Sequence, residues 1–163
     1  MGRSFNVGRL PTGTPNIVSY QYTAGQTFKA GALVVDIAAG TISECGADPV
    51  SVLGVALEPA GGRPGGSGIM GDPSYITGGQ RGEVSVLVAD GSELYSCRGI
   101  NGATDPATPA VTNIGEQYGV VKSGDDWCLD LAELAALVME VVDIDVDQKI
   151  FFCKVIPAVR ALG

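Results

Sequence analysis

Closely spaced glycines constrain the fold of this chain more than any other feature of its sequence. Residues 25–58 read GQTFKAGALVVDIAAGTISECGADPVSVLGVALE, with short apolar runs between the glycines. Many of the apolar residues are β-branched and suit the pleated, half-buried surface of a sheet. Glycine also adopts the positive φ angles that tight turns need. The stretch is therefore expected to form a compact β unit that serves as a scaffold.

The composition extends this expectation to the whole chain. Of the 163 residues, 24 are Gly and 9 are Pro, while 45% are hydrophobic and 17% are charged. Such glycine and proline contents favour turns, and the hydrophobic content is too high for a disordered chain. We expect an all-β fold, a small β-barrel or β-sandwich with long Gly-rich loops. It would comprise an extended N-terminal arm at residues 1–15 and a single β domain at residues 16–163.

Local patterns predict individual elements of this domain. Asp90-Gly91 is a strong hairpin signal between strands at 83–89 and 93–97. The other expected elements are a strand at 17–22, a second hairpin around 123–126, a helix of one or two turns within 130–140, and a closing strand pair at 138–144 and 149–156. Gly-rich or polar loops are expected at 60–82 and 99–115.

The charge balance indicates which partners to expect. Lys and Arg total 10 and Asp and Glu total 18, which gives a formal net charge of −8. Nucleic acid is not an expected partner, because phosphate binding needs clusters of basic residues. A helix needs about 18 consecutive apolar residues to cross a bilayer, and no apolar run in the sequence is that long. The first residues also lack the apolar core of a signal peptide. We expect synthesis in the cytoplasm and no membrane partner.

Histidine is absent from the sequence. It is the usual general base, the usual partner of Ser and Cys nucleophiles, and the commonest transition-metal ligand. The cysteines are widely separated and form no CxxC pair, which predicts buried, reduced thiols without a catalytic role. These four residues are Cys45, Cys97, Cys128 and Cys153. We therefore expect no enzymatic activity, no cofactor and no such metal site.

One acidic run is a candidate cation site. On a strand, Asp143, Asp145 and Asp147 would share one face at intervals of about 6–7 Å, where Ca²⁺ or Mg²⁺ could bind. The run departs from the EF-hand spacing, because Gln148 stands where the turn glycine is needed. The alternative interpretation is a solvated strand face that discourages edge pairing.

The N-terminal arm is a candidate binding segment. Its only charged residues are basic, on a chain that is otherwise acidic, and Pro11 and Pro15 keep it out of a regular helix. An extended basic segment with apolar side chains suits a groove or a sheet edge on an acidic partner. The residues expected to make this contact are Arg3, Phe5, Val7, Arg9 and Leu10.

The order of turns and strands in residues 25–58, and more loosely in 83–97 and 116–156, resembles the head decoration (cement) proteins of tailed bacteriophages. The resemblance implies a non-enzymatic virion structural protein, made in the host cytoplasm, that binds the outer surface of a major-capsid lattice and stabilises it. It also implies that the major capsid protein is the partner and that the chain forms a homo-oligomer, with a trimer favoured.

Three alternatives to this function remain open. A tail, neck or fibre-base component would fit the long loops. A carbohydrate-binding module would use Trp127 or Tyr118 as a stacking platform beside Asp125 and Asp126. A hydrolase would need two carboxylates at a defined separation, and the sequence places no such pair.

Overall fold

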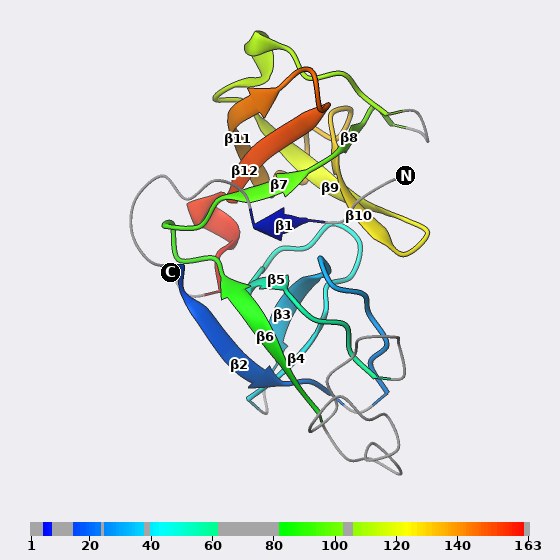
Figure 1. Cartoon of the computed structure of the whole chain (residues 1–163), viewed down its shortest axis with the longest axis vertical. Coiled ribbons are helices and arrows are strands. Elements are labelled where there is room, and N and C mark those ends of the chain that lie inside the picture. The colour runs from blue at the N-terminus through cyan, green and yellow to red at the C-terminus, as the bar shows by residue number, and fades with distance from the viewer. Residues whose placement is uncertain are drawn as a thin grey trace.

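The computed structural model describes residues 5–7, 15–23, 25–37, 40–61, 82–102 and 106–161, except the side chains of Asn6 and Val7. Within these ranges nearly all regular structure is β, which confirms the all-β prediction. The strands form two sheets, drawn in the upper and lower halves of Figure 1. The only helical elements in these ranges are two short 3₁₀ turns at Val111–Asn113 and Pro157–Val159.

The larger sheet has seven strands. Their spatial order is β1 (Asn6–Val7), β7 (Tyr95–Cys97), β12 (Ile150–Val155), β11 (Met139–Asp145), β9 (Gln117–Ser123), β10 (Asp126–Asp130) and β8 (Gly99–Ile100). All of these neighbours pair antiparallel except β10 and β8, which are parallel. The expected hairpin at 123–126 is present as β9–β10, and the expected closing strand pair is present as β11–β12.

The smaller sheet has five antiparallel strands. Their order is β2 (Ile17–Gln21), β6 (Glu83–Val88), β5 (Gly54–Ala56), β3 (Leu33–Ile37) and β4 (Thr41–Glu44). Gly40, with φ of 69°, lies in the turn of the β3–β4 hairpin. The glycine-punctuated stretch is therefore a compact β unit, as predicted. Among the described residues, the two edges of this sheet meet at a parallel bridge between Tyr22 and Ile42 and at the hydrogen bonds of Thr23 beside it. No ladder between described residues joins these edges, so the barrel is not closed.

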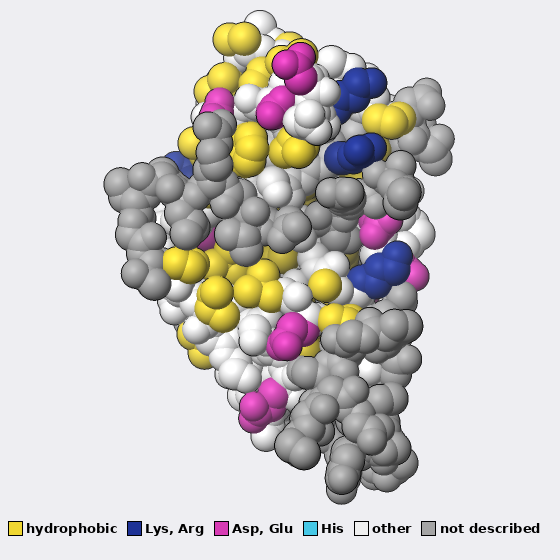
Figure 2. All heavy atoms as spheres, viewed as in Figure 1, with side chains coloured by type: hydrophobic (Ala, Val, Ile, Leu, Met, Phe, Trp, Pro, Cys, Tyr) yellow, Lys and Arg dark blue, Asp and Glu magenta, His cyan; other side chains and the backbone are white. Residues whose placement is uncertain are grey.

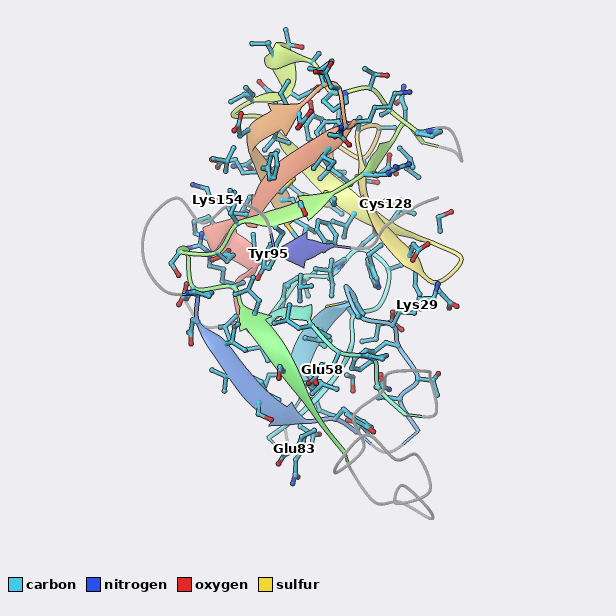
Figure 3. The ribbon with its side chains drawn as sticks, viewed as in Figure 1. Lys29, Glu58, Glu83, Tyr95, Cys128 and Lys154 are labelled. Atoms are coloured by element: carbon cyan, nitrogen blue, oxygen red, sulfur yellow. The ribbon has the colours of Figure 1, made fainter. Side chains whose placement is uncertain are left out.

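Side chains from both sheets form one hydrophobic core. Its largest fully buried members include Tyr22 and Leu87 from the smaller sheet and its extension, and Trp127 and Phe151 from the larger sheet. Tyr95 lies where the two sheets meet in Figure 3, and its hydroxyl donates a 2.8 Å hydrogen bond to the carbonyl of Leu87. The two sheets thus share one hydrophobic interior.

The hairpin predicted at Asp90-Gly91 is wrong. β6 stays in the smaller sheet, whereas β7 pairs with β12 and β1 in the larger sheet. A turn does form at this position, because the Asp90 carboxylate accepts hydrogen bonds from the backbone N–H and the hydroxyl of Ser92. Both edges of β6 are already occupied, by β2 and β5, so a returning strand has no place beside it.

The helix predicted within 130–140 is also wrong. The acids that suggested a helix start instead stabilise tight turns. Asp130 accepts hydrogen bonds from the N–H groups of Ala132 and Gly102, and Glu133 accepts from Ala135 and Ala136. The bonds from Ala136 and Ala135 lower the pKa of the Glu133 carboxyl. The next regular element is β11, which begins at Met139.

The N-terminal segment departs from the predicted arm. Phe5 is only 2% exposed and meets the ring of Tyr95 edge-on, with centroids 6.3 Å apart. The two residues of β1 pair with β7. A large aromatic side chain gains more from burial in its own core than from exposure on a free arm. Asn6 and Val7 are therefore strand residues of the larger sheet, and Phe5 packs in the core beside them.

Gly54 offers a direct test of the packing inside the smaller sheet. A Cβ atom at this position would lie 2.2 Å from the backbone oxygen of Leu87 and 2.9 Å from Cγ1 of Val86. We expect Gly54→Ala to lower the free energy of unfolding by about 1–3 kcal/mol, because backbone must move to admit the methyl group. Urea denaturation monitored by circular dichroism measures this loss.

Gly46→Ala is the matched control, because nothing lies within 4 Å of a Cβ atom there and its φ is not left-handed. Equal unfolding midpoints for the two variants would contradict the described packing of β5 against β6.

Candidate binding surface

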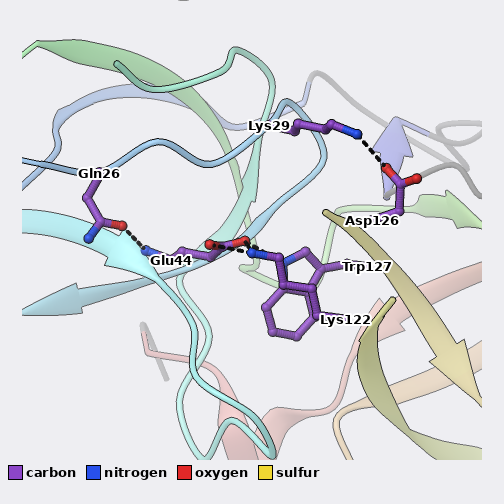
Figure 4. Close-up of polar contacts among 6 residues, drawn as sticks. All are labelled: Gln26, Lys29, Glu44, Lys122, Asp126 and Trp127. Atoms are coloured by element: carbon purple, nitrogen blue, oxygen red, sulfur yellow. Dashed lines mark hydrogen bonds and ion pairs between the residues drawn. The ribbon is translucent and has the colours of Figure 1, made fainter. Parts of the chain in front are cut away.

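A polar cluster fastens the two sheets together (Figure 4). Oε1 of Glu44, at the end of β4, accepts a 2.9 Å hydrogen bond from Nε1 of Trp127 in β10. The same carboxylate pairs with Nζ of Lys122 in β9, at 2.8 Å and 2.9 Å from its two oxygens. Nearby, Nζ of Lys29 lies 3.6 Å from the Asp126 carboxylate. Each contact joins the first half of the chain to the β9–β10 hairpin.

The side chains of this cluster bond to one another between the two sheets. Trp127 is 1% exposed, and the backbone N–H of Glu44 donates to the side chain of Gln26 at 2.9 Å. Among the described residues that are not exposed, every buried side-chain nitrogen or oxygen has a hydrogen-bond partner. The acids and bases of this cluster therefore act on one another and hold the sheets together.

The carbohydrate-platform prediction is wrong for the same reason. A stacking platform needs an exposed ring, yet Trp127 is covered by the core and points its N–H at Glu44. Tyr118 is also buried, and its hydroxyl accepts a 2.9 Å hydrogen bond from the side-chain amide of Asn113. Neither ring presents a face to a sugar.

The predicted acidic face is not formed as a strand face. β11 ends at Asp145, and Asp147 lies in the turn that follows. The ladder between β11 and β12 also shifts register between Val141 and Asp143. The Asp145 carboxylate accepts a hydrogen bond from the N–H of Gln148 and so caps that turn. Within the part of the chain that is described, no group of three or more acidic or sulfur side chains is arranged to hold a metal ion.

The cysteines lie in the core as free thiols, as predicted. Burial, with a smaller contribution from the charge of Glu44, raises the pKa of Cys45 from 9.0 to about 12. Burial likewise raises the pKa of Cys128 to about 11. The Sγ atoms of Cys97 and Cys153 are 3.9 Å apart on neighbouring strands, and burial raises the pKa of Cys97 well above its usual range. Protonated, buried thiols are poor nucleophiles.

The predicted arm residues have separate outcomes. Phe5 lies in the core and is not free to anchor a partner. Val7 lies in β1, but its side chain, like all of Arg3, Arg9 and Leu10, is outside the described residues. The proposed arm contact therefore loses its aromatic anchor.

A sheet edge that sequence reasoning missed is the most exposed candidate surface. Asn16 O accepts a hydrogen bond from Val88 N, and Tyr22 N donates to Gly82 O, at 2.9 Å and 3.0 Å. The β2–β6 ladder between them keeps an unbroken register. In an antiparallel pair the backbone groups of alternate residues face the partner strand. Those of Ile17 and Ser19 therefore face away from β6.

We call the outward backbone groups of Ile17 and Ser19 the β2 edge. Past Tyr22 the strand meets β4, where Thr23 N donates to Ile42 O. Because this contact is parallel, the part of β2 that contains Ile17 and Ser19 extends past the turn at Gly40. β2 lies along the lower left border of Figure 1. No residue that the structure describes forms a ladder with this side of β2.

The side chains at this edge are exposed as well. Ile17 is 48% exposed and Val18 is 37% exposed, and they project from opposite faces of the strand. Other exposed apolar side chains, such as Val50 and Leu134, stand in separate segments and need no special explanation. In the described ranges, no strand except β2 has two adjacent large hydrophobic side chains so exposed.

Removing the Glu44 carboxylate tests the fastening between the sheets. We expect Glu44→Ala to lower the free energy of unfolding by about 1–3 kcal/mol, because the buried Trp127 Nε1 loses its carboxylate acceptor. Glu140→Ala, which removes the cross-strand partner of Lys154 at 3.5 Å, should cost less than about 1 kcal/mol as a partly exposed pair. Chemical denaturation of both variants, with Trp127→Phe to complete a double-mutant cycle, measures the coupling. Additive losses from Glu44→Ala and Trp127→Phe would contradict the bond.

Cys45 predicts a loss of stability in alkaline solution. The folded state holds the thiol proton more tightly than the unfolded state, so the protonated Cys45 thiol contributes to the free energy of unfolding. This contribution is complete below the unfolded pKa of 9.0 and declines as pH rises towards about 12. Between about pH 8 and about pH 10.5 it should fall by about 2 kcal/mol. Urea unfolding of the wild type and Cys45→Ala at both pH values isolates it. The variant should show the smaller decline, and equal declines would reject the assignment.

Comparison with known proteins adds no family to this description. No protein-family model, no curated protein and no solved structure matches the chain.

Proposed function

We propose that the chain is a non-enzymatic structural protein that attaches to the surface of a larger protein assembly. The best-fitting class is the virion capsid decoration protein, which binds the outer surface of a major-capsid lattice and stabilises it. In this proposal the major capsid protein is the partner, the chain acts as a homo-oligomer with a trimer favoured, and the mature protein lies on the virion exterior.

The observation that carries the proposal is the β2 edge. A sheet edge with unpaired backbone groups can add a strand from another protein, and native proteins usually blunt such edges with Lys, Pro or a bulge. β2, with the sequence IVSYQ, contains no Lys or Pro, and its ladder with β6 has no bulge. An unprotected edge with exposed apolar side chains favours attachment to another protein.

The internal chemistry of the domain is consistent with a structural role. Glu44, Lys122 and Trp127 contact one another across the sheets, and the buried Glu93 carboxylate accepts hydrogen bonds from Gly91 N and Val155 N. These polar groups stabilise the fold, while the described thiols are buried. In the described residues, no helix is long and apolar enough to cross a membrane.

Cosedimentation tests the proposal. Undecorated particles would be assembled from the major capsid protein encoded in the same genome, mixed with the fluorescently labelled chain and pelleted. We expect saturable binding with a fixed number of chains per capsid subunit, because the lattice repeats one site. Particles saturated beforehand with the unlabelled chain are the matched control. A labelled chain that stays in the supernatant at every particle concentration would overturn the capsid assignment.

A further inference from the structure

We infer that the β2 edge binds an extended segment of another protein, which adds as a sixth strand to the smaller sheet and carries basic residues on both sides of an apolar centre. The inference rests on the proposed structural function and names the chemistry of its partner. The occupant is recognised by its main chain and by charge, and a deep pocket is not required.

The backbone fixes the form of the occupant. The β2 edge presents two N–H and two C=O groups, those of Ile17 and Ser19, at the spacing of alternate residues in a strand. Only another extended chain offers donors and acceptors at that spacing. The contact with β4 beyond Tyr22 blocks one end of β2, so the added strand must cover the part nearer Ile17.

The side chains favour an apolar centre. Ile17 and Val18 lie beside each other on opposite faces, so a partner strand with β-branched residues would contact both. Ser19 follows with its hydroxyl bonded to Glu83 at 3.2 Å. Val18 faces the same way as Tyr20, which packs against the core, so a partner side chain there would extend the buried surface.

The charges favour basic flanks. The exposed carboxylates of Glu83 and Asp90 mark the two ends of β2: Glu83 is paired with Gln21, and Asp90 accepts a 3.0 Å hydrogen bond from Asn16. Neither β2 nor β6 contains a Lys or Arg, and the Arg160 guanidinium lies beside Gly91, the residue after Asp90. A strand added to β2 would lie about 10 Å from β6, within reach of a long Lys or Arg side chain.

Figure 2 agrees with this distribution. Of the described Lys and Arg side chains visible in that view, most lie on the right, next to some acidic ones, whereas hydrophobic and acidic side chains without a visible Lys or Arg lie at the lower left, where Figure 1 places β2. Glu83 is labelled in Figure 3 at the lower end of this region.

The same charges disfavour a second copy of β2 as the occupant. If two β2 strands paired antiparallel about a two-fold axis at Ser19, Ile17 of one copy would face Gln21 of the other. Asp90 of each copy would then lie level with Glu83 of its partner, at three strand spacings or about 14 Å between the backbones. Like charges at that separation oppose association, whereas opposite charges across a sheet favour it.

The test uses the full chain and defined peptides. The probe is the blocked peptide KVTVTVK, and the charge-reversed control is EVTVTVE. Titration of the ¹⁵N-labelled chain, followed by amide chemical shifts, should show saturable changes at Ile17 and Ser19 with the basic peptide. The acidic peptide should bind roughly fivefold to tenfold more weakly, because two favourable cross-strand charge contacts become repulsive.

Three variants separate the edge from the rest of the surface. Ser19→Pro removes one outward N–H and the hydroxyl bond to Glu83 but no backbone bond to β6, and Ile17→Lys adds a charge that blunts the edge. Both should abolish saturable binding of the basic peptide while the unfolding transition stays cooperative. Val50→Lys makes the same change as Ile17→Lys at a site that is 86% exposed and away from β2, and it should bind like the wild type.

Each other outcome overturns the inference. Equal affinity for both peptides would reject the basic flanks, and shifts elsewhere without shifts at Ile17 and Ser19 would reject the edge. Concentration-dependent shifts at the edge without peptide would assign it to a second copy. The peptide titration contains no capsid, so its outcome is independent of the cosedimentation experiment. If particles bound the Ile17→Lys variant as well as the wild type, the capsid function would be retained and the β2 edge would be excluded as the attachment site.

Discussion

The pairing of β6 on both sides is the constraint on which the rest of the structure depends. β2 occupies one edge of β6 and β5 the other, so the chain must leave the smaller sheet after Val88. It crosses over and forms β7 in the larger sheet, where the Tyr95 hydroxyl bonds back to the Leu87 carbonyl. This crossover brings the two sheets together, and their buried side chains form one core. It also leaves β2 as an outermost strand.

The last described residues of the chain then return to the smaller sheet and bond beside β5. After β12, Val52 N donates to Val159 O and Ala161 N donates to Val52 O, at 2.7 Å and 2.9 Å. Together with the Glu44 cluster, these contacts fasten the two sheets at separate points. These contacts connect the sheet that carries the β2 edge to the rest of the core. If the β2 edge binds a partner as proposed, such preorganisation would lower the entropy lost on association.

The sequence predicted elements whose determinants are local. The β3–β4 unit and the β9–β10 hairpin follow from glycine turns and strand patterns within a few residues. Asp90-Gly91 carries an equally good turn signal and yet does not make a hairpin, because the neighbours of β6 come from distant segments. Asp130 and Glu133 fit a helix start, but bonds such as Gly119 N to Glu133 O tie that segment to the sheet.

The candidate site was harder to predict for the same reason. The alternation of residues 17–22 identified a strand, but whether a strand is central or peripheral depends on the order of the whole sheet. Phe5 was expected to anchor a partner, and Trp127 was a sugar platform in one of the alternatives; both are buried. A pattern of single aromatic residues does not distinguish a platform from a core. Pairing partners such as Glu44 for Trp127 lie 83 positions away and leave no local signal.

Hydrogen–deuterium exchange across residues 17–21, compared between the free chain and the chain bound to undecorated particles, tests the central claim most directly. The outward amides of the β2 edge have no partner among the described residues in the free chain, so they should exchange rapidly there and become protected on the particle. Protection elsewhere on the chain, with unchanged exchange at Ile17 and Ser19, would contradict the claim that β2 is the attachment surface.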